Sequence, residues 1–253
     1  MTQRRLVGVL ACRLTGSRLY GKPLQNLADG TSILRVIVDV LRAQDFVDDV
    51  VLALADEPDS AALEAWAERH DVGSVRGHPT DVLERLIAAA EWSGATDVLR
   101  KTTESPFFDL DAMAAAWDMH VRDANDITVV DDCPLGTATE FYSLQALRDC
   151  HERGDDGDRS EYVSQYGRTH PEEFRIGLVR PEPRCRRTDL RLTVDYPEDL
   201  MLCRRLYAQL EHLAPLVPLR ELIRVLDERP DLRSLVAEHV HDETFWAQHL
   251  PAS

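Results

Sequence analysis

The chain contains very little lysine and no cysteine framework. Of its 29 basic residues, Lys22 and Lys101 are the two lysines, and the five cysteines are scattered without a C-x-x-C pair. No apolar run approaches the roughly 20 residues of a membrane span, and no apolar signal-peptide core is recognised. An odd number of widely spaced cysteines is typical of reduced proteins. We therefore expect a cytoplasmic protein without membrane contact.

Positive charge is also scarce overall. The 253 residues include 29 basic and 45 acidic side chains, which gives a formal net charge of −16. Such a surface repels nucleic acid and anionic lipid, so a general polyanion-binding protein is excluded. Residues 1–28 nevertheless carry five basic residues and no acid. This distribution favours a local anion site, with a chance distribution as the alternative.

Short apolar runs alternate with amphipathic segments along the first half of the chain. The runs at 5–11, 49–54, 72–76 and 97–101 predict buried strands, and the segments at 32–44, 59–70 and 110–121 predict helices. Thr80-Asp81 is predicted to cap a further helix. Extended chain is predicted at 127–142, shorter strands at 174–179 and 190–194, and helices after Pro197 and Pro218. This pattern indicates an α/β fold with a mainly parallel sheet. The loops at 12–22, 76–81 and 101–109 all follow strands, so we expect them to meet at one sheet edge, where ligands bind.

The loop from Ala11 to Lys22 carries the strongest chemical signal. Arg13 and Arg18 offer forked hydrogen-bond donors and Lys22 a compact cation. Glycines in the same loop allow backbone N–H groups to approach an oxyanion. These groups suit a triphosphate. Because Pro23 follows Lys22, the loop is not a Walker A motif.

Five segments in order resemble one family. The segment 11–22 resembles the R-x-x-S-x-R-L-P-G-K signature of bacterial cytidylyltransferases related to spore-coat polysaccharide protein F. Residues 76–85 resemble that family's R-G-x-x-x-D-V-L-x-R, and 100–109 its R-x-T-G-D-C-P-x-x-D. Residues 160–164 resemble R-E-H-V-T, and 190–200 resemble L-R-W-T-V-D-T-P-E-D-L. The family is similar to the CMP-Kdo and CMP-sialate synthetases, and the likeness covers residues 5–210.

The resemblance implies a Rossmann-like, three-layer α/β/α nucleotidyltransferase fold over residues 1–210, with 211–253 as a helical extension on the domain or on a partner subunit. It implies that CTP donates CMP to an anionic acceptor while pyrophosphate leaves. Mg²⁺ would be held by Glu104 and Asp195, and the catalytic candidates are Arg13, Lys22 and Lys101. The implied nucleotide-binding residues are Ala11, Cys12, Arg13, Gly16, Ser17, Arg18, Lys22, Arg76, Gly77, Asp81 and Thr103. We expect a homodimer.

Departures from the family pattern concentrate where the acceptor is expected. Thr103-Glu104-Ser105 replaces G-D-C, and Ser160 and Tyr162 replace the Arg and His of R-E-H-V-T. The predicted acceptor-binding residues are Lys101, Glu140, Glu161, Arg184 and Arg186. The acceptor is predicted to be either a sugar acid or sugar phosphate, or a phosphonate or phosphinate. The alternatives are a non-catalytic nucleotide-binding homologue and a glycan-pathway nucleotidyltransferase that uses another nucleoside triphosphate.

Other candidate residues have simpler interpretations. His239, His241 and Glu243 show metal-like spacing, but a solvated terminal helix explains them better. Cys12 and Cys133 are interpreted as packing residues because no histidine is nearby in the sequence. Asp81 and Arg85 are placed either to form a surface ion pair or to lie near the cytidine.

Overall fold

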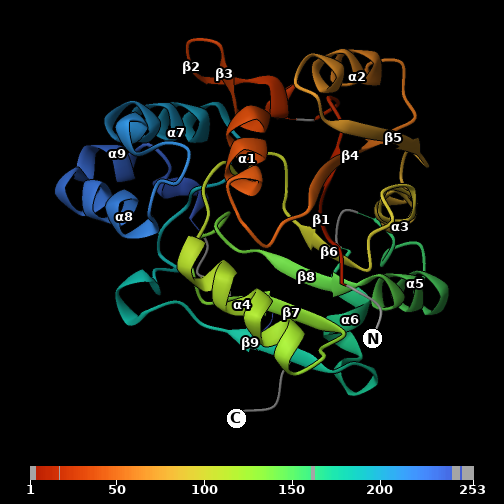
Figure 1. The fold of residues 1–253 in the computed structure, drawn as a ribbon. Helices are drawn as coiled ribbons and strands as arrows, with labels where there is room; N and C mark the ends of the chain where they lie inside the picture. The colour runs from red at the N-terminus through yellow and green to blue at the C-terminus, as the bar shows by residue number, and fades with distance from the viewer. Residues whose placement is uncertain (1–3, 17, 161–162, 241–245, 247–253) are drawn as a thin grey trace.

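The computed structural model describes residues 4–16, 18–160, 163–240 and 246, and its centre is a seven-stranded sheet (Figure 1). The strand order is β5-β4-β1-β6-β8-β7-β9, and β8 runs antiparallel to both neighbours while the other pairs are parallel. These strands are β1 (Leu6–Cys12), β4 (Asp49–Ala55), β5 (Gly73–Gly77), β6 (Asp97–Arg100), β7 (Ile127–Val130), β8 (Glu140–Ser143) and β9 (Ile176–Val179). A separate ribbon pairs β2 (Asn26–Ala28) with β3 (Thr31–Ser32).

Helices cover both faces of this sheet (Figure 1). One face is covered by α1 (Ile33–Arg42), α2 (Ser60–Arg69) and α4 (Leu110–Arg122), and the other by α3 (Val82–Trp92), α5 (Leu144–Arg153) and α6 (Gln165–Thr169). The chain ends in α7 (Pro197–Leu210), α8 (Leu219–Glu228) and α9 (Pro230–Ser234), which add to the α1 side. The arrangement is the predicted three-layer α/β/α architecture.

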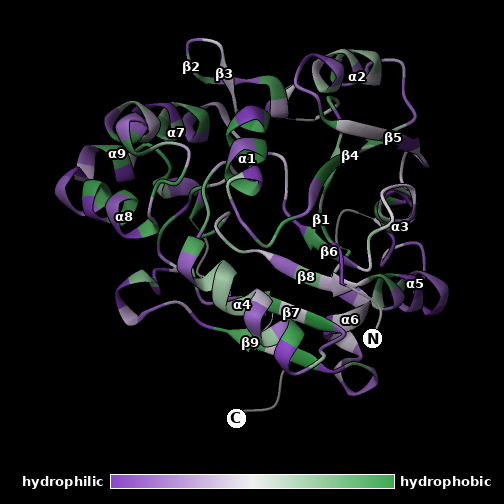
Figure 2. Cartoon of the chain, viewed as in Figure 1, coloured by the Kyte–Doolittle hydropathy of each residue, from purple (hydrophilic) through white to green (hydrophobic). Residues whose placement is uncertain are grey.

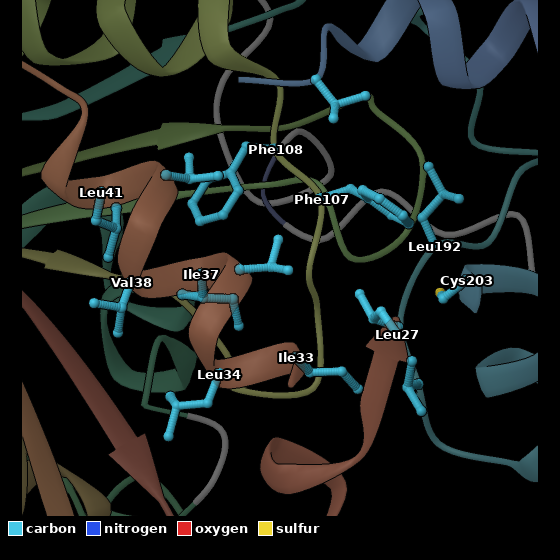
Figure 3. Close-up of a cluster of buried hydrophobic side chains, with 14 of the residues drawn as sticks. Leu27, Ile33, Leu34, Ile37, Val38, Leu41, Phe107, Phe108, Leu192 and Cys203 are labelled. Atoms are coloured by element: carbon cyan, nitrogen blue, oxygen red, sulfur yellow. The ribbon is translucent and has the colours of Figure 1, made fainter. Parts of the chain in front are cut away.

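Alternation along β1 shows why the sheet has two apolar faces. Leu6 and Leu10 pack toward α1, whereas Val7 and Val9 pack toward α3, and all four are fully buried. Figure 2 shows the apolar colour concentrated along the strands and the inner helix faces, with polar residues outside. Helix α1 turns one apolar face inward, where it meets two phenylalanines from the loop after β6 (Figure 3). Burial of each such side chain contributes about 1.5–3 kcal/mol.

Every strand and helix predicted within the first 122 residues is confirmed, with ends shifted by one or two positions. The predicted strand at 190–194 is wrong, because this segment forms only an isolated bridge between Leu135 and Arg191 and bonds to loops. The segment expected to be extended, 127–142, contains β7 and most of β8. The antiparallel direction of β8, helix α5 and the β2–β3 ribbon were not predicted.

The order of the strands reverses between β1 and β6. Strands β4 and β5 continue outward from β1, whereas β6 opens the other half of the sheet. In parallel α/β sheets, ligands bind beyond the carboxyl ends of the strands at such a switch point. The loops after Cys12 and Arg100 leave these two strands side by side. Within the described residues, the structure contains no helix long and apolar enough to cross a membrane.

Candidate functional site

The loop after β1 depends on two glycines. A Cβ on Gly16 would lie 2.7 Å from the carbonyl oxygen of Leu19, so a larger residue would push the loop open. Gly21 takes the left-handed conformation with φ of 64°, and its N–H donates to the Leu14 carbonyl oxygen at 2.9 Å. This turn returns the chain toward the sheet edge and places Lys22 over it.

Lys22, Glu104 and Asp195 converge at this edge. The Lys22 Nζ lies 2.7 Å from Asp195 Oδ1, and both side chains are about one-quarter exposed. The Val194 N–H donates to the Glu104 carbonyl oxygen at 3.0 Å, which joins the two loops that carry the acids. Burial raises the pKa of Glu104, Lys22 lowers it and Asp195 raises it, so the three charges interact. Segments separated by more than 80 residues thus form one charged site.

Arg191 and Asp199 support Asp195 from behind. The buried Asp199 carboxylate accepts from Arg191 Nε at 2.8 Å and from the backbone N–H groups of Asp195 and Tyr196 at 2.9 and 3.0 Å. Arg191 Nη2 also donates to Asp195 Oδ2 at 2.7 Å. Although burial raises the pKa of Asp195, Lys22 and then Arg191 hold it below its ordinary value. Asp195 is therefore kept ionised and fixed in position.

An aromatic stack connects this acid to the loop after β1 and to the C-terminal segment. The Arg18 guanidinium carbon lies 4.9 Å from the centre of the Tyr196 ring. The same ring stacks on His239, with 3.8 Å between ring centres and 4° between planes. His239 is thus packed against Tyr196, whereas solvation was expected.

Thr103 links the two loops at the switch point. Its hydroxyl donates to the Ala11 carbonyl oxygen at 3.2 Å and bonds the thiol of Cys12. Burial raises the pKa of both Cys12 and Cys133 to about 12, so neither thiol ionises near neutrality. The geometry agrees with packing roles for both cysteines.

The loop after β5 is placed at the same edge, but Arg76 is engaged locally. Arg76 forms two 2.6 Å bonds to the Glu64 carboxylate and one of 3.2 Å to Asp56. Gly77 allows close packing, because a Cβ there would lie 2.7 Å from the Glu84 carboxylate. The Arg76 side chain is therefore held by neighbouring acids rather than directed at the charged site.

Asp81 and Arg85 do not pair with each other. Asp81 caps α3 by accepting from the Glu84 N–H at 2.8 Å, and its other oxygen meets His151 Nε2 at 2.8 Å. The buried Arg85 guanidinium donates instead to two backbone carbonyls of the preceding loop. Its Nε has no partner among the described residues. Both side chains support the loop after β5.

Glu140 lies on the other side of the switch point, at the start of β8. Its carboxylate accepts from Arg100 at 2.7 Å, from the Tyr142 hydroxyl at 3.1 Å and from Trp246 Nε1 at 2.9 Å. The Trp246 N–H donates to Asp131 at 2.8 Å. Although burial alone would raise it, Arg100 and these donors hold the pKa of Glu140 below its usual range. Glu140 therefore orients Arg100.

Lys101 is buried, with 3% of its surface exposed. Its Nζ donates to the carbonyl oxygens of Phe107, Gly136 and Ala138 at 2.8, 2.6 and 3.2 Å. Its three donors are thus directed at backbone groups. This corrects the expectation that Lys101 faces an acceptor or a phosphate.

The predicted Arg184 and Arg186 are exposed and bonded within their own loop. Arg184 pairs with Glu182 at 3.0 Å, and Arg186 donates to the Pro181 carbonyl oxygen at 2.9 Å. Among the described residues, no bond brings them to the charged site. Five predicted or weighed residues lie outside the described ones: Ser17, Glu161, Tyr162, His241 and Glu243.

The sequence analysis assigned no role to Arg100, Arg191 or Asp199. A signal was present for the last two, because Arg191, Asp195 and Asp199 follow one another at four-residue intervals. Arg100 could not be found in this way, because its partner Glu140 lies on β8, 40 positions further along the chain.

Comparisons with known proteins agree with this architecture. A sequence model of the cytidylyltransferase family matches residues 7–228. The spore coat polysaccharide biosynthesis protein SpsF of Bacillus subtilis is 28% identical over 228 residues, which cover 88% of this chain and 94% of that protein. The structure of a cytidylyltransferase from Leptospira borgpetersenii has a TM-score of 0.82 at 21% identity, covering 91% of this chain and 97% of that one. CMP-2-keto-3-deoxy-manno-octonic acid synthetase, in complex with CTP, has a TM-score of 0.60 at 15% identity, covering 81% and 99%.

Because the family match spans nearly the whole described fold, including the loops that carry Lys22, Glu104 and Asp195, the chain belongs to the cytidylyltransferase family and is a CTP-dependent nucleotidyltransferase.

Proposed function

We propose that the protein transfers CMP from CTP to a small anionic acceptor at the site formed by Lys22, Glu104 and Asp195. The acceptor oxygen bonds to the α-phosphorus, the bond from that phosphorus to the bridging oxygen breaks, and pyrophosphate leaves. The observation that carries the proposal is the convergence of one lysine and two acids, from three separate segments, at the strand-order reversal. The acceptor provides its own nucleophilic oxygen.

The loop after β1 would hold the triphosphate. Arg13, Arg18 and Lys22 supply its positive charge, and Gly16 and Gly21 keep its backbone close to the sheet edge. Lys22 Nζ lies 2.7 Å from Asp195 Oδ1 and balances its charge. Binding of the nucleotide would move Lys22 onto phosphate oxygens, which releases one Asp195 oxygen for a cation. Preorganised charge of this kind stabilises the transition state.

A divalent cation fits Glu104 and Asp195. Within the described residues, no group of three or more histidine, cysteine or acidic side chains gathers around one point. Two carboxylates suit Mg²⁺, which takes few protein ligands and completes its shell with phosphate oxygens and water. When bound, such an ion would neutralise charge on the α-phosphate. Replacement of the family aspartate by Glu104 is compatible with this role, because both acids offer carboxylate oxygens.

The acceptor would lie beyond β6 and β8, next to Arg100. This guanidinium is oriented by Glu140 and lies close enough to Glu104 to lower the pKa of that acid. An anionic acceptor therefore meets a fixed cation beside the metal carboxylates. The family relationship favours a sugar acid or sugar phosphate, and the altered residues at 103–105 and 160–162 leave a phosphonate or phosphinate as the second class.

The test is a pyrophosphate-release screen. CTP, UTP, ATP and GTP would each be combined with sugar acids, sugar phosphates and phosphonates, with and without Mg²⁺. We expect release with CTP and with acceptors of one class. The variants Lys22→Ala and Asp195→Ala should lose at least about 100-fold in kcat/KM, because each removes a charged group that stabilises the transition state. Asp39→Ala, whose partner Arg35 lies on the same exposed helix turn, is the matched control.

Two results would contradict the proposal. Undiminished turnover in both site variants would refute the assignment of the site. Failure of every CTP and acceptor combination, together with binding of Mg²⁺·CTP to the wild-type protein, would show nucleotide binding without transfer to these acceptors.

A further inference from the structure

Lys101 occupies a cage of carbonyl oxygens instead of an ion pair. Its three Nζ donors reach Phe107, Gly136 and Ala138 at 2.6–3.2 Å, and the Nζ lies 4.4 Å from the centre of the Phe108 ring. Three acceptors match the three N–H bonds of an ammonium group. An aromatic face adds attraction for the same cation. The side chain therefore acts as an internal cross-link.

The cage joins the segment of Glu104 to a second loop, which packs against the segment of Asp195. Phe107 belongs to the loop of Glu104, whereas Gly136 and Ala138 precede β8. A Cβ on Gly136 would lie only 2.7 Å from the Thr193 nitrogen, so this second loop is pressed against the segment of Asp195. Lys101 thus spans one side of a three-segment assembly.

Further bonds close the assembly on its other side. The Ser105 hydroxyl donates to the Thr193 hydroxyl at 3.0 Å, and the Val194 N–H donates to the Glu104 carbonyl oxygen at 3.0 Å. These bonds attach the Glu104 loop directly to the Asp195 segment. Figure 3 shows Phe107 beside Leu192 and Phe108 on the side of α1, and both belong to the buried apolar cluster. The Phe107 carbonyl that accepts from Lys101 is therefore fixed by packing.

A buried lysine is a costly way to connect loops. Burial lowers the pKa of Lys101 to about 7, since the ammonium loses its hydration, while Cys133 and Glu104 raise it. An apolar residue of equal length would avoid that cost but would leave three carbonyls without a donor. Lys101 thus lies beside the loops that hold Glu104 and Asp195. At such a site, accurate spacing of the two carboxylates matters.

We propose that Lys101 is a positioning residue that sets the relative placement of Glu104 and Asp195 through its three carbonyl bonds. It touches neither nucleotide nor acceptor. This inference rests on the proposed function only for the identity of the two acids as metal ligands. The carbonyl cage itself is independent of that proposal.

The experiment restores the missing amine chemically. Lys101→Ala removes three methylenes and the amine, which together have the size of propylammonium. Calorimetry at pH 6.5, where Lys101 retains its third proton, would measure the Mg²⁺ concentration that half-saturates the enhancement of CTP binding. In Lys101→Ala, we expect this Mg²⁺ concentration to rise about 10-fold or more. The Tm should fall by about 5–10 °C, because buried carbonyls lose their donor. Propylammonium should reverse both changes, whereas 1-propanol, with a single donor, should not.

One control and one alternative variant separate positioning of the two acids from general stability. Leu147→Ala, on α5 at the opposite face of the sheet, should lower the Tm by a similar amount without changing the Mg²⁺ requirement. Lys101→Met keeps the side-chain volume, so it replaces Lys101→Ala if the smaller residue prevents folding, and it should show the same raised Mg²⁺ requirement.

The outcomes distinguish the two proposals. An unchanged Mg²⁺ requirement in both Lys101 variants, or equal rescue by 1-propanol, would overturn the positioning role. If the wild-type protein does not bind CTP more tightly with Mg²⁺, the proposed metal site fails instead. In that case, rescue of the Tm by propylammonium still tests the cage, because it is measured without nucleotide.

Discussion

The buried pair of Arg191 and Asp199 offers a sharp test of how the site is held together. Arg191 and Asp199 are 6% and 1% exposed, and they share two bonds of 2.8 and 2.9 Å. Asp199 also accepts from two backbone N–H groups at the start of α7. Asp199→Ala removes all of these acceptors and leaves the guanidinium buried with only Asp195 as a charged partner.

The expected loss follows from these contacts. Removing one partner of a buried ion pair costs about 3–5 kcal/mol, and losing a helix cap costs about 1 kcal/mol more. We therefore expect the free energy of unfolding to fall by about 4–6 kcal/mol. For a chain of this length, that corresponds to a Tm lower by about 10–20 °C. Asp195 also loses its backbone anchor, so CTP turnover should fall in the protein that remains folded.

The assay is chemical denaturation monitored by circular dichroism, with Asp189→Ala as the matched control. Asp189 also accepts from two arginines, but its side chain is half exposed, so its loss should cost less than about 1 kcal/mol. Adding Arg191→Met to Asp199→Ala should recover about 2 kcal/mol, because the unpaired charge is removed. If Asp199→Ala is no more destabilising than Asp189→Ala, the claim that this pair supports the site is wrong.

Three further predictions address other parts of the assembly. Gly136→Ala should lower the free energy of unfolding by at least about 2 kcal/mol and weaken Mg²⁺·CTP binding. Gly94→Ala, also at positive φ but in open space, should lower it by about 1 kcal/mol and leave binding unchanged. Equal effects of the two variants would refute the close contact at Gly136. Trp246→Phe removes one donor to Glu140, so the KM for the acceptor should rise while the KM for CTP stays constant, and a change confined to CTP would contradict the assignment of that side. The pKa of Lys101 is lowered from 10.5 to about 7, so the unfolded chain binds more protons than the folded protein between these two pH values. The free energy of unfolding should therefore rise with pH across this window, by at most about 5 kcal/mol. Denaturation measurements on Lys101→Met should show no such rise.

The sequence predicted the first half of the fold well because its signals are local. The apolar run at 49–54 could only be a buried strand, and Asp81 marks the start of α3 by a capping bond that spans three residues. The later part was harder, since β8 is short and pairs antiparallel to a parallel sheet. The segment at 190–194 has strand-like residues, yet its backbone bonds go to Leu135 and Glu104, which lie in loops rather than in a strand of the sheet.

The site was predictable where chemistry follows from a motif and was missed where it follows from distant contacts. Lys22 and Asp195 were both proposed from motif positions, and the structure places them 2.7 Å apart. Lys101 was predicted to be a catalytic and acceptor-binding residue, but its partners are backbone carbonyls, which carry no signature in a sequence. Arg76 illustrates the reverse case, because a motif arginine is bonded to acids of α2 and its preceding loop.

The position of Trp246 has a consequence for biosynthesis. Glu140 receives one of its donors from a residue synthesised 106 positions later. At about 5–20 residues per second, the ribosome needs several seconds to travel that distance, so the sheet can assemble before this side of the switch point is complete. Trp246 supplies that donor through its indole N–H, and its own backbone N–H donates to Asp131 at 2.8 Å. Completion of this side of the switch point therefore waits for a residue that follows every strand of the sheet.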